Sequence, residues 1–141
     1  MVKKLKLEDY KEIYSKVPRL CVEAVIRKDD GIIFSKRKVF PSNIWHIPGG
    51  TVLLGENLKQ AIQRVVKEEI NVEVNNIEFL TIQEYSPKSG FGQAISIVYE
   101  MTYVRGEFKP DEYTSEIKVF SKNPKGLLEE HKQILKKINI N

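Results

Sequence analysis

The sequence predicts a fold of the α/β (α+β) class, in which helices pack against a mixed β-sheet. Runs of β-branched and apolar residues, arranged as hairpins and single strands, are interspersed with segments of helical periodicity. The chain has 141 residues, which is long enough to bury one core, and it contains no repeat, low-complexity segment or linker. We therefore expect residues 1–141 to form a single domain.

The N-terminal third of the chain predicts a helix followed by a hairpin. Apolar residues recur at helical spacing over residues 5–17, and Pro18 then favours an end to the helix. Residues 20–26 and 32–38 predict two strands, because they are rich in β-branched and apolar residues and an Asp-Asp-Gly turn separates them.

The rest of the chain predicts a bend, two helices and three strands. Two glycines in residues 45–50 free the backbone for a tight bend. A helix is expected over residues 57–70, and a last helix over residues 127–138. The strands expected between these helices are residues 77–85, 94–104 and 117–121.

The composition favours a soluble, cytoplasmic protein. Cys21 is the single cysteine, so no internal disulfide framework is possible and a reducing compartment is expected. No apolar run is long enough to cross a bilayer, so we expect no membrane partner. The net charge is +4, but the lysines are scattered, so we expect no nucleic-acid partner. A local basic pocket for a phosphorylated compound is compatible with the same charge.

Two acidic side chains on the helix expected at residues 57–70 depart from a simple amphipathic pattern. With Leu58 as the origin, Glu69 lies at about 20° on the helical wheel, inside the apolar stripe. A carboxylate there is costly unless it is paired or binds a metal. The alternative is that Glu69 reaches water from the last turn. Glu68 lies on the flank, where it either has a function or forms an ordinary pair with Arg64.

The last helix contains a similar departure. His131 lies at about 40° from Leu127, within the apolar stripe of that helix. A histidine in such a position is either a hydrogen-bonded core residue or a catalytic group, and the pattern alone favours the core residue.

These residues resemble a known motif. The stretch from Gly50 to Val72 resembles the Nudix box, G-x5-E-x7-R-E-U-x-E-E-x-G-U, and the segment leading into it resembles the one that precedes the box in that family. The matching positions are Gly50, Glu56, Arg64, Val66, Glu68, Glu69 and Val72. The resemblance implies an α/β/α sandwich with a mixed β-sheet, and a hydrolase that acts on nucleoside diphosphate compounds.

Two positions depart from the box. Val65 stands where the family has its first glutamate after the arginine, a residue that helps to hold metal or acts as the base in many members. Asn71 replaces the later glycine, and asparagine also adopts the left-handed conformation at modest cost. Metal binding by Glu68 and Glu69 is still expected.

One branch of the family, the GDP-mannose mannosyl hydrolases, lacks the same glutamate. The resemblance to that branch extends from the N-terminal helix to the last helix. It rests on Glu8, Asp9, Tyr10, Pro18, Glu23, Lys36, Arg37, Pro41, Trp45, Glu69 and His131, with Glu130 where the branch has a polar metal ligand. The segment over residues 86–93 is shorter than its counterpart.

The resemblance implies a divalent-metal site. Its expected ligands are the carbonyl of Gly50 and the carboxylates of Glu68, Glu69 and Glu130. Mg²⁺, with Mn²⁺ as the alternative, suits such oxygen ligands and neutralises a leaving diphosphate. Members of the family often dimerise, so a homodimer is also expected.

The resemblance also implies catalytic roles. Arg37 is expected to bind the diphosphate, and Glu23 to bind the substrate or to stabilise positive charge on a sugar. If water attacks the anomeric carbon of a nucleotide sugar such as GDP-mannose, His131 is the expected base. If water attacks phosphorus of a nucleoside triphosphate, ADP-ribose or a similar compound, Glu68 is the expected base. A third alternative is a nucleotide-sugar binding protein without turnover.

Overall fold

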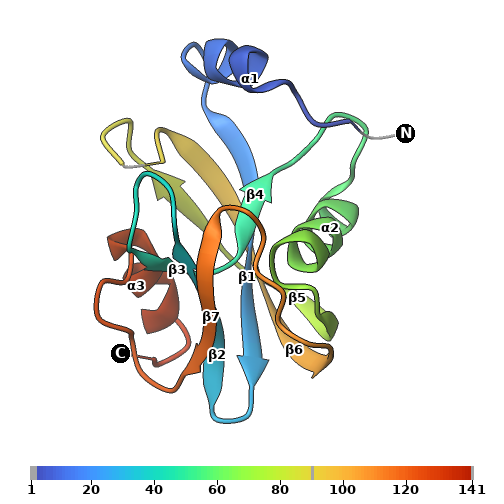
Figure 1. Cartoon of the computed structure of the whole chain (residues 1–141), viewed down its shortest axis with the longest axis vertical. Coiled ribbons are helices and arrows are strands. Elements are labelled where there is room, and N and C mark those ends of the chain that lie inside the picture. The colour runs from blue at the N-terminus through green and yellow to red at the C-terminus, as the bar shows by residue number, and fades with distance from the viewer. Residues whose placement is uncertain (1–2, 90, 141) are drawn as a thin grey trace.

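The computed structural model describes residues 3–89 and 91–140, and its elements form three layers, with a sheet between helices (Figure 1). The elements are α1 (Leu7–Tyr14), β1 (Arg19–Lys28), β2 (Gly31–Arg37), β3 (Trp45–His46), β4 (Gly49–Thr51), α2 (Leu58–Ile70), β5 (Glu73–Tyr85), β6 (Ala94–Arg105), β7 (Thr114–Phe120) and α3 (Glu129–Lys136). The predicted α/β/α sandwich with a mixed sheet is confirmed.

The sheet has seven strands and contains both parallel and antiparallel pairs. Its main path is β3-β2-β1-β6-β5, with β4 paired to β1 and β7 paired to β2. The β1–β6 pair is parallel, and the other strand pairs are antiparallel. The central position of β1 explains its nearly continuous apolar sequence, because both faces of this strand are covered.

Two apolar cores lie on opposite faces of the sheet. Val22, Ala24 and Ile26 of β1 pack with α2, whereas Val25 packs with α3 on the other face. Side chains alternate between the faces of a strand, so Glu23 lies on the same face as Val25. This alternation places a carboxylate on the α3 side of the central strand.

The ends of α2 agree with the sequence prediction for residues 57–70. Asn57 is the N-cap and forms a capping box with Gln60. Asn71 is the C-cap, with φ 60° and ψ 41°, and so adopts the left-handed conformation expected of it.

Three predicted boundaries differ from the structure because tertiary packing decides them. The strand predicted at residues 77–85 begins at Glu73, since β5 pairs along most of β6. The helix predicted at residues 5–17 spans only Leu7–Tyr14. None of its side chains is buried, so no packing against the core stabilises further turns. The strand predicted at residues 117–121 begins at Thr114, where β7 pairs with Arg37 of β2.

Two further segments also differ. The bend predicted at residues 45–50 contains two short strands, β3 and β4, on either side of residues 47–48. The helix predicted at residues 127–138 is reduced to α3, because Leu127 forms a bridge with Trp45 instead of a helical turn.

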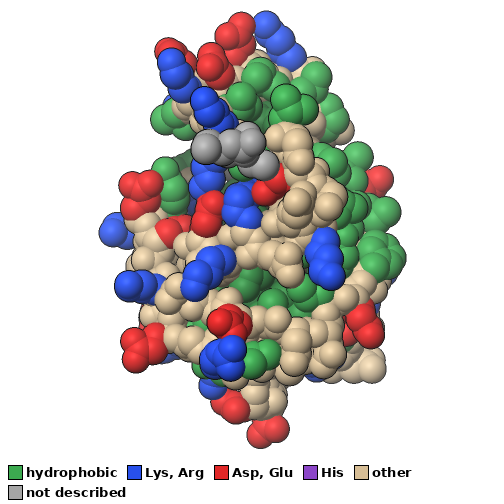
Figure 2. All heavy atoms as spheres, turned by 90° about the vertical axis from the view of Figure 1, so that its right-hand side faces the viewer, with side chains coloured by type: hydrophobic (Ala, Val, Ile, Leu, Met, Phe, Trp, Pro, Cys, Tyr) green, Lys and Arg blue, Asp and Glu red, His purple; other side chains and the backbone are tan. Residues whose placement is uncertain are grey.

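The surface of the sheet is covered unevenly. Figure 2 shows hydrophobic side chains along the right-hand flank of the face it displays. Among the exposed apolar side chains, Leu20 and Ile95 are partners in the β1–β6 pair, and Ile82 and Phe79 lie on β5. The outer part of the sheet is therefore less covered than its centre. Within the described residues, no helix is long and apolar enough to cross a membrane.

Candidate active site

A cleft of about 660 Å³ is lined by residues of α1 and of the neighbouring end of the sheet. Figure 1 shows α1 beyond that end of the sheet. Its walls come from α1, β1, β4, the C-terminal end of α2, the β5–β6 loop and α3. The predicted residues Glu23, Arg37, Gly50, Glu69 and His131 all line this cleft. The fold thus gathers side chains that are far apart in the sequence.

The inner wall of the cleft contains a buried hydrogen-bonded cluster. The hydroxyl of Tyr85 donates to Glu23, with distances of 2.7 Å to Oε1 and 2.8 Å to Oε2. The Nε2 atom of His131 contacts Glu23 Oε2 and lies 2.7 Å from the Tyr85 oxygen. All three side chains are buried, and His131 is only 2% exposed.

The hydrogen bonds of His131 define its protonation. The backbone N–H of Ile47 donates to Nδ1 at 3.0 Å, so Nδ1 carries no proton. The proton of the neutral imidazole is then on Nε2, which donates it to Glu23. Both ring nitrogens are occupied, and neither presents a free lone pair to the cleft.

Glu23 is held in its ionised form. Burial acts to raise the pKa of Glu23, but the hydrogen bonds that its carboxylate accepts from His131 and Tyr85 act to lower it. The pKa therefore lies below the ordinary value of 4.5. A buried carboxylate with two donors is the arrangement that keeps such a charge inside a protein.

Glu69 has a different environment in the same cleft. The backbone N–H of Gly49 donates to its Oε2 at 2.9 Å, and His46 Nδ1 lies 3.9 Å from its Oε1. Burial raises the pKa of Glu69 to about 8 and lowers the pKa of His46 to about 4. His46 is thus neutral at neutral pH and gives Glu69 no counter-charge.

The geometry of Glu69 suits a divalent cation. Its carboxylate is buried and lines the cleft, where a bound cation would stabilise the ionised form. The described part of the chain contains no group of three or more acidic, histidine or cysteine side chains that could hold a metal. Mg²⁺ needs only one or two carboxylates when water and substrate phosphates complete its shell. The donors present are therefore compatible with Mg²⁺ held jointly with a substrate.

The other three predicted metal ligands are placed differently from one another. Gly50 lines the cleft. It packs closely against Val65, because a Cβ atom added to residue 50 would lie only 3.1 Å from Val65 Cγ2. Glu68 is exposed and binds Lys4 at 2.6 Å and Arg64 at 3.4 Å. Glu68 and Glu130 are both absent from the residues that line the cleft.

Arg37 brings positive charge into the cleft. Its Nη2 atom donates to the carbonyl of Phe40 at 3.0 Å, and its guanidinium lies 5.0 Å from the centre of the Phe91 ring. Its Nε atom is buried and has no hydrogen-bond partner within the described residues. Burial lowers the pKa of Arg37, yet a guanidinium stays charged at neutral pH. Arg37 therefore places a permanent positive charge at the cleft.

The part of the motif that lies outside the cleft braces the loop before α2. Arg64 binds Glu56 through two contacts, of 2.6 Å from Nε and 3.0 Å from Nη2, and donates to the carbonyl of Thr51 at 2.9 Å. Glu56 also accepts from the backbone N–H of Leu53 at 2.9 Å. These contacts fix the connection between β4 and α2, and so the approach of Glu69 to the cleft.

Several cleft residues had no role in the sequence prediction. Tyr85 binds Glu23, and Asp111 lines the cleft. Ser96 also lines the cleft, and its buried Oγ has no hydrogen-bond partner among the described residues. Strand pairing and loop packing bring these residues to the cleft, and no local sequence signal marks them.

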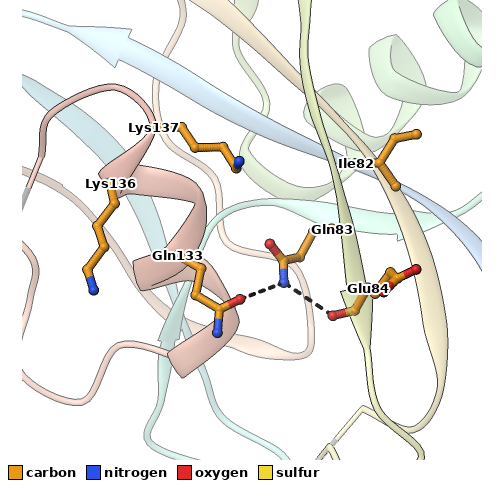
Figure 3. A pocket seen from close by; sticks show the side chains of 6 residues that line it. All are labelled: Ile82, Gln83, Glu84, Gln133, Lys136 and Lys137. Carbon is orange, nitrogen blue, oxygen red and sulfur yellow. Dashed lines mark hydrogen bonds between the residues drawn. The ribbon is translucent and has the colours of Figure 1, made fainter.

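A second depression lies between β5 and α3 (Figure 3). In this groove Gln83 donates to Gln133 at 3.0 Å, and Lys136 and Lys137 lie on the helix side. It contains none of the predicted site residues. The first cleft is therefore the candidate active site.

Comparisons with known proteins identify the family of the chain. A family model described as the NUDIX domain matches residues 17–138. The chain is 32% identical over 139 residues to the ADP-ribose pyrophosphatase of Methanocaldococcus jannaschii, covering 96% of this chain and 80% of the relative. It is 30% identical over 127 residues to the low-salt glycan biosynthesis protein Agl8 of Haloferax volcanii, covering 85% and 81%.

The fold is also similar to that of a solved Nudix hydrolase. The crystal structure of a MutT NUDIX hydrolase from Burkholderia pseudomallei superposes with a TM-score of 0.80 at 22% identity, covering 88% of this chain and all of that one. Together with the match over residues 17–138, these similarities assign the chain to a family: it belongs to the Nudix family and is a Nudix hydrolase.

Proposed function

We propose that the chain is a metal-dependent pyrophosphatase that attacks phosphorus in a nucleoside diphosphate compound such as ADP-ribose. The observation that carries this proposal is the state of His131, whose ring nitrogens are both engaged, by Ile47 N–H and by Glu23. A general base for attack at carbon needs a free lone pair, which His131 does not offer. The similarity to the ADP-ribose pyrophosphatase supports the same choice of reaction and substrate class.

Within this proposal, Glu69 holds the divalent cation and Arg37 binds the diphosphate. A bound Mg²⁺ or Mn²⁺ supplies positive charge that offsets the charge of the diphosphate. The guanidinium of Arg37 lines the cleft, where its fixed charge suits a phosphate oxygen. Glu68, the side chain predicted to act as base for attack at phosphorus, is exposed and paired outside the cleft. Glu23 lies in the cleft, but the donors that stabilise its charge also lower its pKa and make it a weak base.

A second candidate is the release of a sugar from a nucleotide sugar such as GDP-mannose. It is favoured by the contact of Glu23 with His131 in the cleft and by Val65 in place of the box glutamate. The similarity to Agl8, a glycan biosynthesis protein, is compatible with it. None of the three similarities described above singles out the mannosyl hydrolase branch.

Two variants assayed on ADP-ribose with Mg²⁺ distinguish these candidates. Glu69→Gln removes the cation-binding charge, and we expect kcat to fall by about 100-fold or more. His131→Gln keeps a donor toward Glu23 but removes any basic nitrogen, and we expect kcat to stay within about tenfold of the wild type, since losing a general base costs at least about 100-fold. Gln133→Ala, on α3 but outside the cleft, serves as the control. A large loss in His131→Gln with an intact Glu69→Gln would overturn the proposal.

A further inference from the structure

Helix α1 reaches over the cleft but is not part of the apolar cores. None of its residues is buried, and it precedes the segment 17–138 that matches the family model. Its contacts with the sheet run through Tyr10, whose hydroxyl accepts from Arg19 Nη1 at 3.1 Å and lies 3.4 Å from Thr51 Oγ1. The position of α1 at the cleft is therefore not explained by burial of apolar side chains. Polar contacts of the Tyr10 hydroxyl hold the helix there.

The face of α1 that is turned to the cleft is aromatic. Tyr10 and Tyr14 are four residues apart, which places them on one side of the helix, and both line the cleft. Their ring centres are 4.8 Å apart with an interplanar angle of 66°. Both rings remain partly exposed. Two aromatic surfaces at the cleft are therefore accessible to a ligand.

A third aromatic ring lines the cleft from the β5–β6 loop. Phe91 lies against the guanidinium of Arg37, and its carbonyl accepts a hydrogen bond from Arg19 Nη2. Arg19 therefore links α1, through Tyr10, to the loop that carries Phe91. Hydrogen bonds hold the Tyr10 side chain and the backbone of Phe91, whereas the cleft around Glu23 contains mostly polar groups.

We propose that α1 and the β5–β6 loop form the nucleobase subsite of the cleft, with the base stacking on Tyr10, Tyr14 and Phe91. Stacking on aromatic side chains and on a guanidinium plane suits a planar π-system. In this arrangement Arg37, in contact with Phe91, lies between the base and the acidic end of the cleft, where a diphosphate needs positive charge. The subsite rests on the proposed function in that the base belongs to a nucleotide substrate.

The test measures binding in the presence of EDTA, so that turnover does not enter. Dissociation constants are determined by ligand-observed NMR for the four common nucleoside 5′-monophosphates and for ribose 5-phosphate, which lacks a base. We expect Tyr14→Leu to weaken the preferred nucleotide by about tenfold, within the range for loss of a stacked base, and to leave ribose 5-phosphate unchanged. Phe79→Leu, an aromatic-to-leucine change at an exposed position of β5, should bind like the wild type.

The alternative outcomes separate this inference from the proposed function. Equal weakening of nucleotide and ribose 5-phosphate, or no weakening at all, would overturn the subsite. So would a wild-type protein that binds no nucleotide better than ribose 5-phosphate. Loss of nucleotide binding in Tyr14→Leu together with an inactive wild-type enzyme on ADP-ribose would keep the subsite and refute the pyrophosphatase proposal.

Discussion

Glu23 and Glu69 share one cleft, yet their environments move their pKa values in opposite directions. Both lie against Gly49, whose N–H donates to Glu69 and whose added Cβ would lie 2.9 Å from Glu23 Cγ. Donors from Tyr85 and His131 stabilise the charge on Glu23, whereas burial without such donors favours the protonated form of Glu69. Such a divergence between neighbouring acids is typical of sites that divide their roles.

This difference predicts an unusual pH dependence of stability in the metal-free protein. The pKa of Glu69 is about 8 in the folded state against an ordinary value of 4.5, so the folded state holds a proton that the unfolded state has lost. The free energy of unfolding must then fall as pH rises toward 8. His46 acts in the opposite direction, but only between its folded pKa of about 4 and its ordinary 6.5. The window from pH 6.5 to 8 therefore isolates Glu69.

Urea unfolding in EDTA at several pH values across that window tests this prediction. We expect the wild type to lose about 1–2 kcal/mol between pH 6.5 and 8, since one proton corresponds to about 1.4 kcal/mol per pH unit. Glu69→Gln should show no such decrease, whereas Glu78→Gln, at an exposed position, should behave like the wild type. A wild-type stability that rises or stays flat over this range would contradict the assignment.

At the scale of elements, α2 combines a structural and a functional role. Its apolar stripe packs on β1 through Ile62 and Val66, while Glu69, close to the same stripe, lines the cleft. The apolar-stripe analysis of the sequence predicted this placement, because helical periodicity is a local property. Glu68 pairs with Arg64, as its spacing on the helix allowed, and also with Lys4, a residue 64 positions away that the helix alone does not indicate.

Asn71, the C-cap of α2, stands where the family has a glycine, and its conformation predicts how substitutions there change stability. Asn71 has φ 60°, and its side chain donates to the carbonyl of Glu107 at 3.3 Å. Asn71→Ala should lower the free energy of unfolding by about 1–2 kcal/mol, because a Cβ without local hydrogen bonding is disfavoured in the left-handed region. Asn71→Gly should stay within about 0.5 kcal/mol of the wild type, since glycine adopts this conformation freely.

Chemical denaturation of both variants measures the difference. Gln63→Ala, on the exposed side of α2, provides the control for an alanine substitution in this helix. Equal stability of Asn71→Ala and Asn71→Gly would show that the left-handed cap does not determine the effect.

At the scale of the whole molecule, the sequence predicted the class of fold, most elements and five residues that line the cleft. These predictions used periodicity, turn residues and a motif of fixed spacing, all of which are local. Contacts between distant segments were not accessible in the same way: Tyr85 reaches Glu23 across 62 positions, and Ile47 reaches His131 across 84. The second of these contacts changes the role expected for His131, from a free base to a group whose nitrogens are both engaged.

The position of attack is the most direct test of this account. An equimolar mixture of ADP-ribose and GDP-mannose is incubated with the protein and Mg²⁺ in ¹⁸O-labelled water, and mass spectrometry locates the label. We predict that ADP-ribose is cleaved and that ¹⁸O is found on a phosphate of AMP or of ribose 5-phosphate. Label on free mannose, released together with unlabelled GDP, would contradict attack at phosphorus and restore His131 as the base.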